Sequence, residues 1–132
     1  MSKVLLITDQ HFGVRNDNIH YVERYRKFYT ETVLPFIDKE GITEILNLGD
    51  TFDRRKAINF SSLEAAKDMW FRPLQDRGIK QTMLLGNHDI YFKNTLRVNS
   101  PELLLGEFNN IEIIYCPGER IIGGKKMMLV PW

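Results

Sequence analysis

The sequence predicts an α/β fold in which a mostly parallel sheet is flanked by helices. Short apolar runs alternate with longer stretches of helical periodicity along the chain. Polar residues follow the apolar runs directly, as they do where buried parallel strands end. A Gly-Gly pair near residue 124 indicates one antiparallel hairpin. The expected order is therefore β-α-β-α-β-α-β-β, with the antiparallel addition last.

The first two elements are a strand and a helix. Residues 3–8, "KVLLIT", form a short apolar run that ends in polar residues. From about 18 to 38 the apolar residues recur near helical spacing, and the aromatic ones, Tyr21, Tyr25 and Phe28, are expected in the core. Pro35 lies inside this stretch, so we expect a kink or an early stop there.

The second strand and helix follow the same pattern. "EILNLGD", residues 44–50, is a strand, and a helix runs from Ser61 as N-cap to residue 77, where Gly78 closes it. Pro73 predicts an irregular last turn. Trp70 and Phe71 are expected in the core, although adjacent helical residues point apart and one of the pair should face outward.

The remaining elements complete the sheet. Residues 79–86 form the third strand, and residues 111–116 the fourth. Between them Ser100 is an expected N-cap with Pro101 at the first helical position, which opens a short third helix. Residues 120–132 read as two strands joined by Gly123-Gly124.

Composition bounds the class of protein. The 132 residues suffice for one hydrophobic core, and 43% hydrophobic with 27% charged residues is typical of a soluble globular domain. The net charge of +1 gives no overall nucleic-acid or membrane signature. The N-terminal apolar run is too short for a signal peptide or a membrane span, so we expect no membrane contact and a cytoplasmic location, which includes the cytoplasm of a phage-infected host.

A single cysteine, Cys116, excludes an internal disulfide and fits a reducing compartment. Because Cys116 ends a strand-like run, we expect it to be a buried small hydrophobe rather than a nucleophile.

Unusual polar residues follow the first three strands. "TDQHFG" supplies Asp9 and His11, and "GDTFD" supplies Asp50 and Asp53. "GNHD" follows the third strand with three more polar side chains at 87–89. In open α/β sheets ligands bind beyond the carboxyl ends of the strands, so these groups should meet at one edge. Turn formers and helix caps account for one such cluster more easily than for three.

Converging carboxylates repel one another unless cations neutralise them. Two divalent ions about 3.5–4 Å apart, bridged by one carboxylate, would do so. A mixture of Asp, Asn and His suits borderline ions such as Mn²⁺, Fe²⁺ or Zn²⁺, and the lack of thiolates disfavours a closed structural zinc site.

The motifs D-x-H, G-D-x-x-D and G-N-H-D, each after a strand, resemble the first three motifs of the calcineurin-like metallophosphoesterase superfamily. "GDTFDRRKA" is most similar to the SbcD-type double-strand-break repair nucleases, which include phage recombination exonuclease subunits. Protein Ser/Thr phosphatases are less similar, because they carry Arg-Gly after the second Asp of this motif, whereas Arg55 follows Arg54 here.

The resemblance implies a role for each matching position. Asp9 and His11 would bind the first metal ion, Asp50 would bridge both ions and Asn87 would bind the second. His88 would be the imidazole that meets the leaving oxygen, oriented by an acidic neighbour, Asp53. The reaction would be phosphodiester hydrolysis at two divalent ions, with Mn²⁺ expected and Fe²⁺ or Zn²⁺ as alternatives.

The resemblance covers only the N-terminal half of the family's α/β/β/α sandwich. The later motifs of the family supply three further histidines, and residues 1–132 contain only His11, His20 and His88. His20 is expected to be an ordinary helix residue. We therefore expect one partial domain, weakly active alone, that needs a complementing C-terminal half. Exposed apolar residues near the end would favour self-association: Met127, Met128, Leu129, Val130 and Trp132.

Basic residues near the predicted edge fit contacts with a DNA backbone, although solvated loop charges are an alternative interpretation of each. These residues are Arg15, Arg54, Arg55, Lys56 and Lys93. The resemblance implies DNA as substrate and an SMC-like ATPase as partner. Other phosphoesterase activities, on small molecules or phosphoproteins, and a non-catalytic fragment remain the alternatives.

Overall fold

The computed structural model describes residues 3–54, 57–92, 95–99, 101 and 104–132. Its central sheet has four parallel strands in the spatial order β1-β2-β3-β6. They are β1 (Val4–Ile7), β2 (Glu44–Asn47), β3 (Lys80–Leu84) and β6 (Ile111–Ile114). The register places Ile45 opposite both Leu5 and Gln81. The predicted α/β class with a mostly parallel sheet is confirmed.

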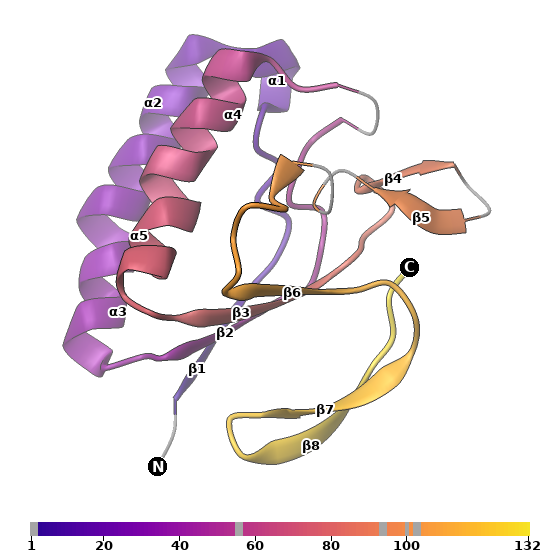
Figure 1. Cartoon of the computed structure of the whole chain (residues 1–132). Coiled ribbons are helices and arrows are strands. Elements are labelled where there is room, and N and C mark those ends of the chain that lie inside the picture. Colours follow the sequence, from indigo (N-terminus) through magenta and orange to yellow (C-terminus); the bar gives the residue numbers. More distant parts are fainter. Residues whose placement is uncertain (1–2, 55–56, 93–94, 100, 102–103) are drawn as a thin grey trace.

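The helices cover one face of this sheet (Figure 1). The first helical segment consists of α1 (Val14–Asp17), α2 (Ile19–Phe28), a π-turn (Tyr29–Val33) and α3 (Leu34–Glu40). The second consists of α4 (Phe60–Ala66), a π-turn (Lys67–Phe71) and α5 (Arg72–Asp76). The main core lies between helices and sheet, where Ile45 and Met83 pack against Ile37, Trp70 and Leu74.

Both helical segments continue past their proline, so the early stop considered for Pro35 does not occur. A π-turn immediately precedes the α segment that contains Pro35, and another precedes the one that contains Pro73. Proline lacks the amide hydrogen that an α-helix interior needs, and its ring crowds the preceding turn. The widened turn relieves both problems, because each proline then lies in the first turn of a new α segment.

The second helical segment differs from the sequence prediction in two details. Its N-cap is Asn59, not Ser61, because the Asn59 Oδ1 accepts the Ser61 N–H at 2.9 Å. Trp70 and Phe71 are both fully buried, so the expectation that one faces outward is wrong. This segment is packed on two sides. The ring centroids of Trp70 and Tyr29 are 5.0 Å apart, and those of Phe71 and Phe108 are 5.8 Å apart.

The predicted C-terminal hairpin is confirmed as β7 (Gly118–Ile122) and β8 (Lys125–Leu129). Gly123 (φ 58°) and Gly124 (φ 78°) form its turn, where both residues need a positive φ. The hairpin lies on the sheet face opposite the helices (Figure 1), where Ile122 and Leu129 pack against the sheet. Because strand β8 alternates its faces, Leu129 is buried and does not belong to the exposed apolar group expected there.

Three further observations complete the comparison with the sequence. A hairpin of β4 (Ile90–Phe92) and β5 (Thr95–Asn99) was not predicted. The predicted N-cap Ser100 lies outside the described residues. Cys116 is exposed rather than buried, because strand β6 already ends at Ile114. Within the described ranges, no helix has the length and apolar character needed to cross a membrane.

Candidate metal centre

The loops after β1 and β2 continue the parallel pairing beyond the strands themselves. The N–H of Asp9 donates to the Gly49 carbonyl at 3.0 Å, and the N–H of His11 donates to the Asp50 carbonyl at 3.0 Å. A bridge between Phe12 and Phe52 extends the ladder further. This ladder sets Asp9 and His11 beside Asp50, as the ends of adjacent parallel strands predict.

The three side chains converge. Single ligand atoms of Asp9, His11 and Asp50 all lie within 4.8 Å of one another, and the Nε2 of His11 is 3.3 Å from the Asp9 Oδ1. The Thr8 hydroxyl donates to the Asp9 carboxylate at 2.6 Å, and this bond lowers the pKa of Asp9 and favours its ionised, metal-binding form.

These side chains project from unusual backbone. The φ angles of Asp9, His11 and Asp50 are 53°, 48° and 54°, in the left-handed region that non-glycine residues avoid. Within the described ranges, the other non-glycine residues with positive φ are Arg15, Asn16 and Asp17, which make α1 a left-handed turn at the end of the β1 loop. Strained conformations of this kind cluster at functional sites, where surrounding contacts hold them.

Two glycines allow the β2 and β3 loops to touch. A Cβ on Gly49 would lie 2.7 Å from the Gly86 nitrogen, and a Cβ on Gly86 would lie 2.2 Å from the Asp50 Oδ1. Any side chain at either position would therefore push Asp50 away from the β3 loop.

Asp89 joins the same two loops from inside the protein. It has 0% exposure, and its carboxylate accepts the N–H groups of Gly86 (2.8 Å), Asp50 (2.8 Å) and Thr51 (3.1 Å). Burial raises the pKa of Asp89 to about 6, and these N–H donors act in the opposite direction. In the sequence, the place of Asp89 at the end of "GNHD" is the signal for this role.

The imidazole of His88 lies beside that of His11, with ring centroids 4.9 Å apart in an edge-on arrangement. The main-chain N–H of His88 donates to the Asp50 Oδ1 at 2.9 Å, which ties the β3 loop to the Asp50 carboxylate. The His88 Nδ1 lies 2.6 Å from the carbonyl oxygen of Asp53. Since a carbonyl only accepts, Nδ1 carries the proton and Nε2 is left for chemistry.

Asp53 contacts His88, as the sequence predicts, but through its main-chain carbonyl rather than through its carboxylate. Its carboxylate contacts the Nδ1 of His11 at 3.1 Å, and only its main-chain carbonyl contacts His88. The cause is the loop ladder, since the Asp53 N–H donates to the Phe12 carbonyl at 3.0 Å and so fixes Asp53 beside the β1 loop. A carboxylate on Nδ1 leaves the Nε2 of His11 facing Asp9, as a metal ligand would.

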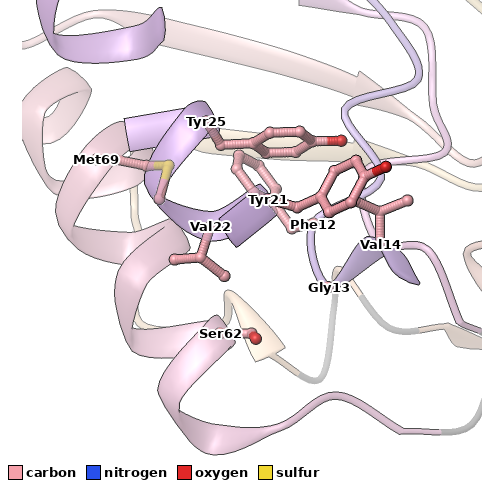
Figure 2. A pocket seen from close by; sticks show the side chains of 8 residues that line it. All are labelled: Phe12, Gly13, Val14, Tyr21, Val22, Tyr25, Ser62 and Met69. Carbon is pink, nitrogen blue, oxygen red and sulfur yellow. The ribbon is translucent and has the colours of Figure 1, made fainter. Parts of the chain in front are cut away.

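Asn87 and Asp50 share an open hollow of about 400 Å³ at this edge, which Leu48, Val130 and Trp132 also line. Its volume lies in the range of small-molecule sites, about 300–1,000 Å³. A second cavity, enclosed by Phe12, Tyr25 and Met69 among others (Figure 2), measures about 10 Å³. It has room for about one water molecule. A third hollow of about 420 Å³ lies beside Asp9 and is also lined by Gln10 and Tyr29, so it offers as much space as the hollow beside Asn87.

The basic residues separate into three groups. Arg54 forms an ion pair with Asp17 and donates to the Asn16 side chain at 3.1 Å, so its charge is used within the chain. Arg15 is exposed, with its guanidinium carbon 6.0 Å from the centre of the Tyr21 ring. The other three predicted contacts, Arg55, Lys56 and Lys93, lie outside the described residues.

The donor set fits a divalent cation. Two carboxylates and one imidazole within 4.8 Å supply oxygen and nitrogen ligands without thiolate, which suits Mn²⁺, Fe²⁺ or Zn²⁺. A cation between Asp9 and Asp50 would also offset the repulsion of their charges.

Comparison with known proteins places the chain in a family. A family model for calcineurin-like phosphoesterases matches residues 2–126. Exonuclease subunit 1 of Enterobacteria phage T4 is 31% identical over 98% of the chain, and the DNA double-strand break repair protein Mre11 of Sulfurisphaera tokodaii is 27% identical over 88%. The crystal structure of Pseudomonas putida nuclease MPE covers 84% of the chain and 46% of its own, with a TM-score of 0.56 at 20% identity, a likeness of fold.

The chain spans only part of the curated relatives. It covers 38% of the phage protein and 29% of the archaeal protein.

Proposed function

The chain belongs to the calcineurin-like phosphoesterase family, and from this membership we propose that it is a metal-dependent phosphodiesterase acting on DNA, as a nuclease subunit in break repair or recombination. The observation that supports the proposal most is the convergence of Asp9, His11 and Asp50 within 4.8 Å at the carboxyl edge of the sheet. The two curated relatives, an exonuclease subunit and a break repair protein, favour DNA over other phosphoesters.

We assign two divalent ions to the centre, with Mn²⁺ expected. Asp9 and His11 would hold the first ion, Asn87 would hold the second, and Asp50, which shares a hollow with Asn87, would serve both. When bound, such ions activate water and stabilise the negative charge that develops on the phosphate. The Asp53 carboxylate holds the Nδ1 of His11, so the Nε2 faces Asp9 and would be available to the first ion.

His88 handles the proton in this proposal. Its Nδ1 is occupied by the Asp53 carbonyl at 2.6 Å, so only Nε2 faces outward. A protonated Nε2 can donate to the leaving oxygen of the phosphodiester and is then recharged from solvent. Asn87 has no titratable group, so the two neighbours cannot exchange roles.

Contacts with the DNA backbone are assigned to the basic loops. Arg15 is the exposed cation of the β1 loop, and Arg55, Lys56 and Lys93 complete the proposed set by their place in the sequence. Arg54 acts indirectly, because its ion pair with Asp17 holds the left-handed segment that carries Arg15.

Full activity is proposed to need more polypeptide than these residues. The chain spans 38% and 29% of its curated relatives, and the family resemblance assigns further histidine ligands to the later motifs. We propose a complementing C-terminal half in a cytoplasmic complex, with an SMC-like ATPase as the further partner.

The test compares two substrates and one variant. Mn²⁺-dependent hydrolysis of linear DNA and of bis-p-nitrophenyl phosphate is measured with and without the C-terminal half of a related nuclease. We expect DNA cleavage to rise on mixing, and Asn87→Ala to abolish it while Asn59→Ala, a helix cap, leaves it intact.

Two results would contradict the proposal. Hydrolysis of the small ester without DNA cleavage would indicate a different phosphoesterase. Saturable Mn²⁺ binding that does not depend on Asn87, together with no hydrolysis in any mixture, would indicate a non-catalytic fragment.

A further inference from the structure

Buried amide side chains form a network on the helix side of the candidate ligands. Asn47, at the end of β2, has 0% exposure, and its Nδ2 donates to the Gln10 Oε1 at 2.9 Å and to the Gln81 Oε1 at 3.1 Å. The Gln10 Nε2 in turn donates to the Tyr29 hydroxyl at 2.9 Å. The network therefore joins the β1 loop, two strands and the π-turn of the first helical segment.

This network is attached to both ligand loops. Gln10 stands between Asp9 and His11 in the sequence. The Asn47 Oδ1 accepts the N–H of Gly49, the residue before Asp50, at 3.0 Å. One amide–amide hydrogen bond, from Asn47 to Gln10, thus links the segments that carry all three converging side chains.

Stability alone does not account for these amides. Replacing both partners of a buried hydrogen bond by apolar groups of similar shape is often neutral or stabilising. The network is also incompletely satisfied, because the Gln81 Nε2 has no partner among the described residues. What the network does supply is geometry, since the strained backbone of Asp9, His11 and Asp50 needs contacts that fix it.

We propose that Gln10 and Asn47 are positioning residues that set the spacing between the β1 and β2 loops, so that the ligand atoms of Asp9, His11 and Asp50 meet at one metal ion. This inference rests on the proposed function. Partners that orient metal ligands typically change metal affinity about 10–100-fold when they are removed. Loss of the Asn47–Gln10 bond should therefore raise the Mn²⁺ dissociation constant even where the folded chain remains stable in urea.

The first experiment measures Mn²⁺ affinity and stability separately. Asn47→Leu and Gln10→Met are compared with Asn110→Leu, which removes an amide that donates to the Ile79 carbonyl at 2.9 Å before β3, at the opposite end of the sheet. The Mn²⁺ dissociation constant is measured by electron paramagnetic resonance, and the urea midpoint is measured in EDTA. We expect the constant to rise about 10-fold or more for the two network variants and less than about 2-fold for the control.

The double variant separates positioning from general stability. With both partners of the bond apolar, Gln10→Met/Asn47→Leu should regain part of the urea midpoint lost in Asn47→Leu, while its Mn²⁺ affinity stays low. Recovery of affinity together with the midpoint would overturn the inference. Equal loss of affinity in Asn110→Leu would do the same.

A metal-free measurement distinguishes this inference from the proposed function. In EDTA, Gln10→Met should speed hydrogen exchange at the His11 N–H, which bonds to the Asp50 carbonyl at 3.0 Å, and leave the Gly86 N–H on Asp89 unchanged. Unaltered exchange at His11 would refute the positioning role. If the parent chain binds no Mn²⁺, the proposed function fails, and the exchange rates still decide the role of Gln10.

Discussion

Single residues in this site adopt conformations that cost free energy, and other single residues compensate. Asp9, His11 and Asp50 each have a left-handed φ, at a cost of about 1–3 kcal/mol apiece. Asp89 offsets part of that cost, because it satisfies three main-chain N–H groups of the β2 and β3 loops from a fully buried position. The ligands and the residues that hold their loops are therefore different residues.

Asp89→Asn should destabilise the chain by about 1–3 kcal/mol, because the new NH₂ group cannot accept the N–H groups that one carboxylate oxygen now accepts. Urea unfolding in EDTA at pH 7.5 measures this change. Asp76→Asn is the matched control, since Asp76 is exposed at the end of α5, and it should shift the free energy of unfolding by less than about 0.5 kcal/mol. Equal effects of the two variants would show that the buried carboxylate does not hold the loops.

Gly86→Ala should abolish Mn²⁺ binding, because the new Cβ would lie 2.2 Å from the Asp50 Oδ1 and displace that carboxylate. Gly118→Ala is the control, since its Cβ would meet only the end of the Arg120 side chain, at 3.3 Å. Calorimetric titration with Mn²⁺ compares the two variants with the parent chain. Normal binding by Gly86→Ala would mean that Asp50 is not a ligand.

Sequence reasoning reached the residues that converge but not those that support them. Asp9, His11 and Asp50 could be chosen because they follow strands at regular places, and parallel strands bring such places together. Asp89 could not be distinguished from a turn former, because its role depends on N–H groups of a loop 39 residues away from it. The sequence paired Asp53 with His88 but could not show that the carbonyl makes this contact while the carboxylate contacts His11, because the ladder between loops sets that geometry.

Helices in this protein accommodate proline by local widening rather than by ending. Tyr29–Val33 and Lys67–Phe71 are π-turns, and each precedes an α segment that begins next to a proline. Sequence periodicity located both helical segments but could not reveal the π-turns, since the spacing of apolar residues does not show which main-chain groups bond i→i+5. The same widening explains how the neighbours Trp70 and Phe71 are both buried.

Pro35→Ala should change the free energy of unfolding by less than about 1 kcal/mol, because the π-turn already removes the clash and the missing bond that proline would otherwise cause. Lys27→Pro, at an exposed position inside α2, should cost about 3 kcal/mol or more. Thermal unfolding followed by circular dichroism measures both. A large loss in Pro35→Ala would indicate that the ring itself contributes to packing.

The whole molecule has one face of its sheet packed by helices and the other covered only in part by the β7–β8 hairpin (Figure 1). Large apolar side chains remain exposed on or next to this second face, with Trp132 at 71% and Val130 at 63%. Val130 and Trp132 line the hollow beside Asn87, and Leu48 lines it together with them and Asp50. An apolar surface of this kind favours association.

We expect concentration-dependent self-association, measured by sedimentation velocity. Val130→Ser/Trp132→Ser should shift the chain toward monomer, because it removes the most exposed apolar side chains of the hollow. Phe60→Ser is the control: Phe60 is 88% exposed, but it lies at the start of α4 in the helical layer. A parent chain that stays monomeric at high concentration would contradict this expectation.

The connectivity of the sheet also orders the events of folding. Pairing Val4 with Glu44, and Glu44 with Lys80, closes long chain loops, whereas the β7–β8 turn closes across only two glycines. Local hairpins form within about 1–10 μs, while distant parallel pairings are slow. Since Asp9, Asp50 and Asn87 follow three different strands of that sheet, the capacity to capture a cation should be among the last properties that a refolding chain acquires.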